Sequence, residues 1–245
     1  MKNNIIKALV VGLLLLFAQL QDFSWLAILI FLFFAGILYL QPIFKTSSLL
    51  FSFLSFAALS LLVPSRFAIV FARSGFESAP AVGLWLCALV FAGIFFLIAG
   101  VKNMVLLRRR EWYYLLYLCL NYLALFLFFS IGTSVGFWLK ALVFFAFNVG
   151  LLREFLRFQD FQLQRLHKVG VFIIALIILE CLWAVSLLPL GFANSASLMT
   201  VIIFTISEIF QRYIRGTLNA RFIRLNTLFA AGVLLVIFLV SNWKL

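Results

Sequence analysis

Residues 82–91 read VGLWLCALVF, and residues 135–144 read VGFWLKALVF, so the two segments match at eight of ten positions. The match includes Gly and Trp and not only the abundant Leu and Phe, which indicates duplication of a two-span membrane hairpin. Two predicted spans separate the copies, so both copies should run in the same direction through the membrane. The repeat is therefore predicted to be parallel and not inverted.

The composition around these segments excludes an ordinary soluble domain. Hydrophobic residues make up 67% of the 245 residues and charged residues 11%, and the mean hydropathy is +1.23. A soluble fold of this size could not hide so much apolar surface from water. We therefore predict an all-α, polytopic transmembrane helical bundle.

We predict nine spans, with eight as the alternative, in a single integral membrane domain over residues 1–245. The first and the third are the weakest candidates. Hairpin repeat units should cover residues 81–131 and 135–190, with 197–242 as a further candidate, after N-terminal spans within residues 1–63. The nine predicted ranges are 5–20, 23–40, 47–63, 81–101, 112–131, 135–152, 169–190, 197–214 and 225–242.

Two local patterns support these boundaries. The four prolines, Pro42, Pro64, Pro80 and Pro189, all fall at predicted span ends, where a missing backbone donor costs least. The first apolar run resembles a signal peptide, but the next run starts at Phe23 with no small-x-small cleavage site before it. An uncleaved helical hairpin is the better interpretation.

The net charge of +12 is distributed unevenly along the predicted topology. With the N-terminus in the cytoplasm, most of the 19 Lys and Arg residues fall on the cytoplasmic side, as the positive-inside bias requires. Each basic cluster adjoins a span, which favours anionic lipid headgroups over nucleic acid as the ligand. We expect a bacterial cytoplasmic membrane. The candidate lipid or partner face comprises Arg108, Arg109, Arg110, Arg153, Arg157, Arg165, Arg212 and Arg215.

Two basic connections carry further structure. Residues 152–168 place Leu152, Phe155 and Leu156 along one helical stripe, which is typical of an interfacial helix. The segment either extends the sixth span over the headgroups or docks a partner protein. In the last basic connection, Glu208 precedes Arg212 by four residues and predicts a helix-spaced ion pair.

The residues that usually carry catalysis are scarce. Cys87, Cys119 and Cys181 all lie within predicted spans, and the single histidine, His167, lies in a basic segment without carboxylate or thiol neighbours. The chain has only seven acidic residues and no glycine-rich phosphate loop. We therefore expect no metal site and no cofactor.

Four polar residues fall inside predicted spans: Glu180, Lys140, Asn121 and Asn148. At about 1.5 Å rise per residue, Glu180 lies near the middle of a hydrocarbon layer of roughly 30 Å, so it should face the bundle and be paired or protonated. Lys140 either pairs with Glu180 or extends outward to the headgroups, and other partners remain open. For Asn121 and Asn148 we expect interhelical hydrogen bonds.

Three function classes follow. The first is an accessory, scaffold or assembly subunit that contacts a membrane-protein partner, a second copy of itself or anionic lipid through its basic cytoplasmic face. The second is a small proton-coupled or lipid transporter in which Glu180 titrates. The third is an intramembrane lipid-modifying enzyme, which the shortage of acid–base groups makes the weakest of the three.

Overall fold

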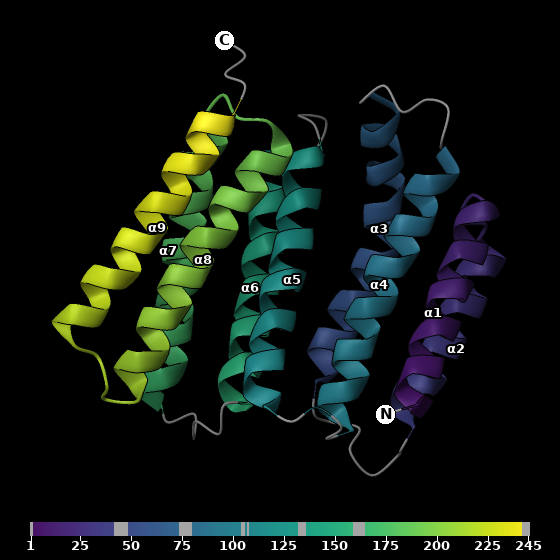
Figure 1. The fold of residues 1–245 in the computed structure, drawn as a ribbon, viewed down its shortest axis with the longest axis horizontal. Coiled ribbons are helices and arrows are strands. Elements are labelled where there is room, and N and C mark those ends of the chain that lie inside the picture. Colours follow the sequence, from purple (N-terminus) through teal and green to yellow (C-terminus); the bar gives the residue numbers. More distant parts are fainter. Residues whose placement is uncertain are drawn as a thin grey trace. The chain divides into compact units, whose positions relative to one another are not determined.

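The computed structural model describes residues 2–41, 49–73, 80–103, 106, 108–131, 136–158 and 165–241, with side chains described except at 68–73, 80, 81 and 165–168. Every regular element within these ranges is an α-helix (Figure 1). The helices are α1 (Lys2–Leu20), α2 (Trp25–Leu40), α3 (Leu50–Arg73), α4 (Pro80–Lys102), α5 (Arg109–Ser130), α6 (Phe137–Phe158), α7 (Arg165–Ser186), α8 (Phe192–Ile214) and α9 (Ala220–Val240).

Seven of these helices are long and apolar enough to cross a membrane: α1, α3, α4, α5, α7, α8 and α9. The all-helical class and the architecture of a multi-pass membrane protein are thus confirmed. The first and third apolar runs, expected to be the weakest, are among the seven. Of the remaining two helices, α2 has only 16 residues. Helix α6 is long enough, but it carries charged residues near both ends: Lys140 near the start, and Arg153, Glu154 and Arg157 near the end.

Two helices extend well beyond their predicted ranges. Helix α3 continues through Pro64 to Arg73, so the expectation that every proline lies at a span end is wrong for Pro64. A proline inside a helix leaves the carbonyl four residues earlier, here that of Ser60, without its usual donor, and such breaks are tolerated in transmembrane helices. Pro80 begins α4, Pro189 follows α7, and Pro42 lies outside the described residues.

Helix α6 continues to Phe158 and so includes the first part of the predicted interfacial segment. Leu152, Phe155 and Leu156 are fully buried on one side, and Arg153 and Arg157 are exposed on the other. This arrangement agrees with the alternative in which the segment extends the sixth span. Residues 159–164 lie outside the described residues, and α7 begins at Arg165.

The chain forms two compact units. Unit 1 comprises Met1–Leu120 and Arg153–Gln162, and unit 2 comprises Asn121–Leu152 and Leu163–Leu245. Both α5 and α6 therefore contribute residues to each unit. A single domain over residues 1–245 stays a prediction.

In unit 1, α1 packs against α4 and α2, and α3 packs against α4 (Figure 1). In its apolar centre the Phe56 ring meets the Phe91 ring edge-on, with centroids 5.9 Å apart, and lies tilted against the Phe95 ring, with centroids 5.7 Å apart. A second aromatic group joins the start of α5 to the end of α6, where the Tyr117 and Phe155 ring centroids are 4.8 Å apart. These contacts fix the position of the last turns of α6 within the unit.

In unit 2, α8 packs against both α7 and α9. Phe145 of α6 meets Phe172 of α7 edge-on, with ring centroids 5.3 Å apart. Large apolar side chains remain exposed along most of α9, as a lipid-facing helix allows.

The two matched segments lie at the starts of α4 and α6, apart from Val135, which is outside the described residues. They bury equivalent positions, Ala88 with Ala141 and Phe91 with Phe144, and they expose equivalent positions, Trp85 with Trp138 and Leu89 with Leu142. The same helical face therefore packs inward in both copies. The duplication itself stays a prediction.

Candidate functional site

Glu180 lies on α7 and is exposed. Ile178 and Leu182 are fully buried, and Glu180 is two residues from each, which is about 200° around a helix with 3.6 residues per turn. The expectation that Glu180 faces the bundle is therefore not met. The large side chains on the same side of α7 are also exposed, and we call this surface the α7 stripe: Val169, Phe172, Ile173, Leu176, Ile177, Glu180 and Trp183.

Lys140, in the first turn of α6, contacts the end of α5. Its Nζ atom donates a hydrogen bond to the carbonyl of Ile131 at 2.9 Å and lies 5.2 Å from the centre of the Phe128 ring. An ammonium group in this position offsets the partial negative charge at the C-terminal end of α5. These contacts do not bring Lys140 to Glu180.

Asn121 of α5 and Asn148 of α6 are brought together. The Asn148 side-chain amide donates a hydrogen bond to Asn121 Oδ1 at 2.9 Å, and both side chains are completely buried within unit 2. The Oδ1 atom of Asn148 is buried without a hydrogen-bond partner. The amide pair joins two helices and leaves one acceptor unsatisfied.

The described basic residues of the predicted cytoplasmic face are exposed, except for Arg212. Arg108 forms an ion pair with Glu111 at 3.6 Å, and both side chains are more than two-thirds exposed, so the pair contributes little stability. The exposed members are Arg108, Arg109, Arg110, Arg153, Arg157 and Arg215. Arg212 is partly exposed, and the side chain of Arg165 lies outside the described residues.

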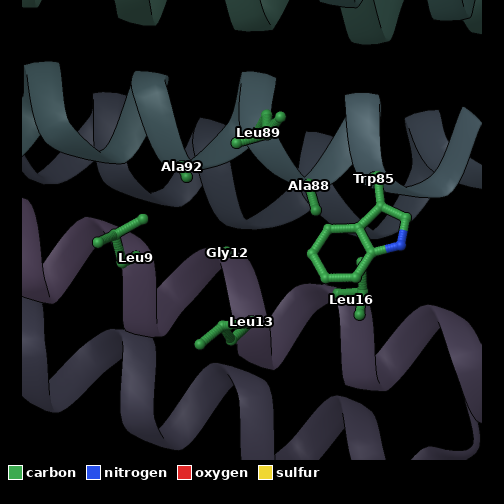
Figure 2. Close-up of a pocket in the computed structure, with 8 residues that line it drawn as sticks. All are labelled: Leu9, Gly12, Leu13, Leu16, Trp85, Ala88, Leu89 and Ala92. Carbon is green, nitrogen blue, oxygen red and sulfur yellow. The ribbon is translucent and has the colours of Figure 1, made fainter. Parts of the chain in front are cut away.

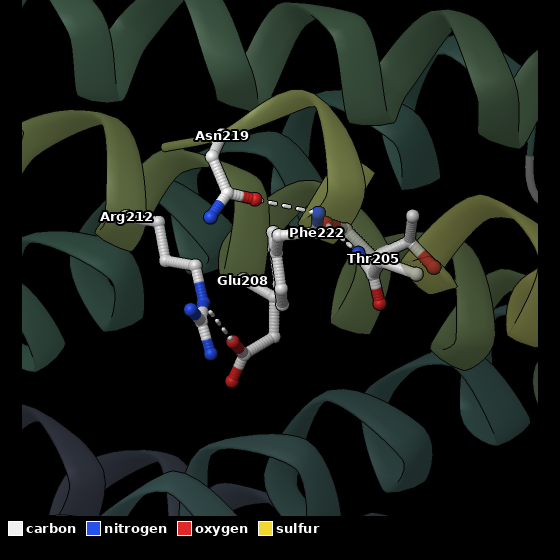
Figure 3. A network of polar contacts seen from close by, with 6 residues as sticks. Thr205, Glu208, Arg212, Asn219 and Phe222 are labelled. Carbon is white, nitrogen blue, oxygen red and sulfur yellow. Dashed lines mark hydrogen bonds and ion pairs between the residues drawn. The ribbon is translucent and has the colours of Figure 1, made fainter. Parts of the chain in front are cut away.

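The predicted ion pair between Glu208 and Arg212 is confirmed, with Nε and Oε2 4.0 Å apart (Figure 3). The guanidinium of Arg212 also lies 3.7 Å from the centre of the Phe222 ring at the start of α9. Asn219 caps α9 by accepting a hydrogen bond from the Phe222 N–H at 2.7 Å. Arg212 thus secures the turn between α8 and α9.

Sequence reasoning missed Glu154, which accepts more hydrogen bonds than the other acidic residues that the structure describes. Its carboxylate accepts hydrogen bonds from the backbone N–H groups of Phe51 and Ser52 at 3.1 and 2.8 Å, and from the hydroxyl of Ser52 at 2.5 Å. The buried Tyr113 hydroxyl donates to the same carboxylate at 3.1 Å. The residue before α3 is Leu49, which offers no side-chain acceptor, so Glu154 supplies the N-terminal cap from another helix.

At the C-terminal end of α2, two lysines donate hydrogen bonds to free backbone carbonyls. Lys7 Nζ donates to the carbonyls of Leu38 and Gln41 at 3.4 and 3.1 Å. Lys102, which is almost fully buried, donates to the carbonyl of Tyr39 and lies over its ring. These ammonium groups satisfy carbonyls that a helix C-terminus leaves free.

Unit 1 also has an apolar groove between α1 and α4 (Figure 2). Its floor is formed where Gly12 of α1 approaches Ala88 and Ala92 of α4. Exposed Leu9, Leu13, Trp85 and Leu89 form its walls. The groove offers mostly apolar contact, and the indole N–H of Trp85 is the polar side-chain group among its lining residues.

In the part of the chain that the structure describes, no three His, Cys, Asp or Glu side chains gather to hold a metal ion. Cys87, Cys119 and Cys181 are free thiols. The side chain of His167 lies outside the described residues. The ionisable groups with defined contacts therefore serve helix ends and helix pairs.

Comparisons with protein families, with curated proteins and with solved structures found no match. The function of this chain has to be argued from its own residues.

Proposed function

We propose that this chain is an accessory or scaffold subunit of a membrane assembly in a bacterial cytoplasmic membrane. It contacts a partner protein and anionic lipid through the basic, predicted cytoplasmic ends of its helices. In this proposal the chain acts by binding and by holding other components in place.

The proposal rests on the division between interior and surface polar groups. Polar side chains inside each described unit form hydrogen bonds between helices, whereas the arginines at the helix ends are exposed. Glu154 and Lys102 hold helix ends, and Asn148 holds Asn121. By contrast, Arg109, Arg110 and the arginines at the end of α6 are exposed. Charges that remain accessible at span ends suit phosphate headgroups or an acidic partner surface.

The carrier hypothesis receives less support. A proton-coupled carrier needs its titrating acid on a closed path through the bundle, and Glu180 lies on an exposed helix face. The enzyme hypothesis would need acid–base groups that converge on a cavity. The described groove between α1 and α4 has no acid–base side chain among its lining residues.

The proposal is tested by purifying the full chain in native-lipid nanodiscs and measuring co-purified proteins and lipids by native mass spectrometry. We expect a stoichiometric protein partner, retained anionic lipid, or both. The double variant Arg109→Gln/Arg110→Gln should lower this retention several-fold.

A control removes a charge from the other predicted side of the membrane with Arg66→Gln, in the second half of α3, where the side chain is partly exposed. Equal losses in both variants would indicate a nonspecific effect of net charge and would contradict a defined face. Recovery of the wild-type chain with neither a partner nor anionic lipid would contradict the proposed function itself.

A further inference from the structure

Glu180 is an exposed acidic side chain within a membrane-spanning segment, where a carboxyl group is energetically unfavourable. It lies within the span Val169–Ser186, eleven residues after the first residue and six before the last, and its neighbours one turn away, Leu176, Ile177 and Trp183, are exposed apolar residues. A carboxyl group surrounded by lipid tails loses its hydration in the charged form and its hydrogen bonds in the neutral form. A molecule that offers a hydrogen-bond donor on this face would offset that cost.

Three lysines in the described part of the chain have side-chain hydrogen bonds elsewhere. Lys140 donates to the Ile131 carbonyl, Lys102 to the Tyr39 carbonyl, and Lys7 to two carbonyls at the end of α2. Each of these ammonium groups already serves a helix C-terminus.

A second copy of the chain is also a poor match. A symmetric contact through the α7 stripe would place the same surface on both sides and bring two Glu180 carboxyl groups toward each other. Like charges in a low-dielectric layer repel strongly. A Lys or Arg side chain from a different protein would instead form an ion pair with the carboxylate.

We propose that the α7 stripe docks a transmembrane helix of a different membrane protein, which places a Lys or Arg side chain against Glu180. This inference rests on the proposed function, because it names the partner that such a subunit would hold. The apolar residues of the stripe supply packing, and the charge pair supplies register and specificity. Trp183 lies one turn from Glu180 on the same face, where its ring can also cover a guanidinium group.

The test places a photo-crosslinking amino acid at position 177 or 184, which flank Glu180 on the exposed face. The full chain is expressed in its native membrane and irradiated, and the adduct is mapped by mass spectrometry. We expect an adduct with a different protein, at a transmembrane segment that carries Lys or Arg within about one helical turn of the linked residue.

The charge itself is then tested with Glu180→Gln and Glu180→Lys. We expect adduct formation to fall at least about tenfold for Glu180→Lys and less for Glu180→Gln, which can still accept a hydrogen bond. Exchange of the partner's cation for Glu should restore the adduct with Glu180→Lys. Glu111→Gln, which removes an exposed carboxylate from α5, is the matched control and should leave the adduct unchanged.

The outcomes separate this inference from the proposed function. If a partner co-purifies but the yield of adduct is the same for the wild type, Glu180→Gln and Glu180→Lys, the proposed docking surface is wrong. The proposal that the chain is a subunit would still stand. An adduct with lipid, with a second copy, or within the same chain would also overturn the docking surface. If neither a partner nor anionic lipid is retained by the wild-type chain, the proposed function fails first.

Discussion

The carboxylate of Glu154 accepts hydrogen bonds from both the backbone N–H and the hydroxyl of Ser52, at 2.8 and 2.5 Å. Ser52 lies in the first turn of α3, where backbone N–H groups have no partner within the helix. The partial positive charge of the helix N-terminus adds to these hydrogen bonds. Glu154 therefore joins the end of α6 to the start of α3 within unit 1.

Replacement of Glu154 should destabilise the protein. Glu154→Leu leaves two backbone N–H groups without their acceptor and leaves the hydroxyls of Ser52 and Tyr113, 3.1 Å apart, with only each other, so we expect the free energy of unfolding to fall by about 3 kcal/mol. Glu154→Gln keeps the shape and one acceptor oxygen, and about half of that loss is expected. Thermal unfolding in detergent or nanodiscs measures both changes.

The control for this variant is Glu111→Gln, because Glu111 is a similarly placed acid whose side chain is exposed. Its unfolding midpoint should stay close to that of the wild type. If Glu154→Leu were as stable as Glu111→Gln, the cap would contribute nothing to unit 1.

The buried amide pair of Asn121 and Asn148 gives a second prediction. Asn121→Ala and Asn148→Ala each break the 2.9 Å hydrogen bond and leave the other amide buried, so each should lower stability. The double variant should lose less than the sum of the single variants, with a coupling energy of about 0.6–1.7 kcal/mol, typical of interhelical hydrogen bonds in membranes. A double-mutant cycle by steric trapping measures this coupling, and strictly additive losses would exclude a stabilising pair.

Gly216 terminates α8 in a conformation that other residues avoid. Its φ is +66°, and the hydrogen bonds from the Gly216 and Thr217 N–H groups to the Tyr213 and Arg212 carbonyls form a Schellman motif. Gly216→Ala should therefore cost about 1 kcal/mol in unfolding free energy. Gly232→Ala, inside α9 with open space around the new methyl group and no positive φ, should instead raise stability by about 0.5–1 kcal/mol. Equal effects at both positions would contradict this explanation.

The span positions were predictable because a segment in a membrane must satisfy its own backbone hydrogen bonds, which makes each long apolar run a helix. The ends of α3 and α6 were not predictable in the same way. Pro64 reads as a terminator, but α3 continues past it. The charged residues after Leu152 indicate the end of a span, but α6 continues to Phe158, where Phe155 packs against Tyr117 of α5.

The direction in which each helix faces was the harder problem. In a soluble helix the buried side is apolar and the exposed side polar, whereas lipid-facing and core-facing positions here are both apolar. The sequence around Glu180 therefore gave no periodicity to show that Ile178 is buried and Ile177 exposed. For Glu154, the only local signal was that the start of α3 has no acidic residue of its own, and its partner lies about a hundred residues away.

Helices α1 and α4 approach each other closely at Gly12, and this contact can be tested. A Cβ atom at this position would lie 2.9 Å from the Cβ of Ala92 and 3.4 Å from the carbonyl oxygen of Ala88. Neither atom belongs to a flexible side chain, so Gly12→Ala must move α1 away from α4. We expect a loss of about 1–3 kcal/mol in unfolding free energy, as for other overpacked interiors.

The matched control is Gly36→Ala in α2, where nothing lies within 4 Å of the new methyl group. There the substitution should raise stability by about 0.5–1 kcal/mol, because Ala restricts the unfolded chain more than Gly does. The exchange Gly12→Ala/Ala92→Gly moves the methyl group from one helix to the other and should recover much of the loss. If Gly12→Ala stabilised the protein as Gly36→Ala is expected to, or if the exchange recovered nothing, small residues at this crossing would not be what holds α1 against α4.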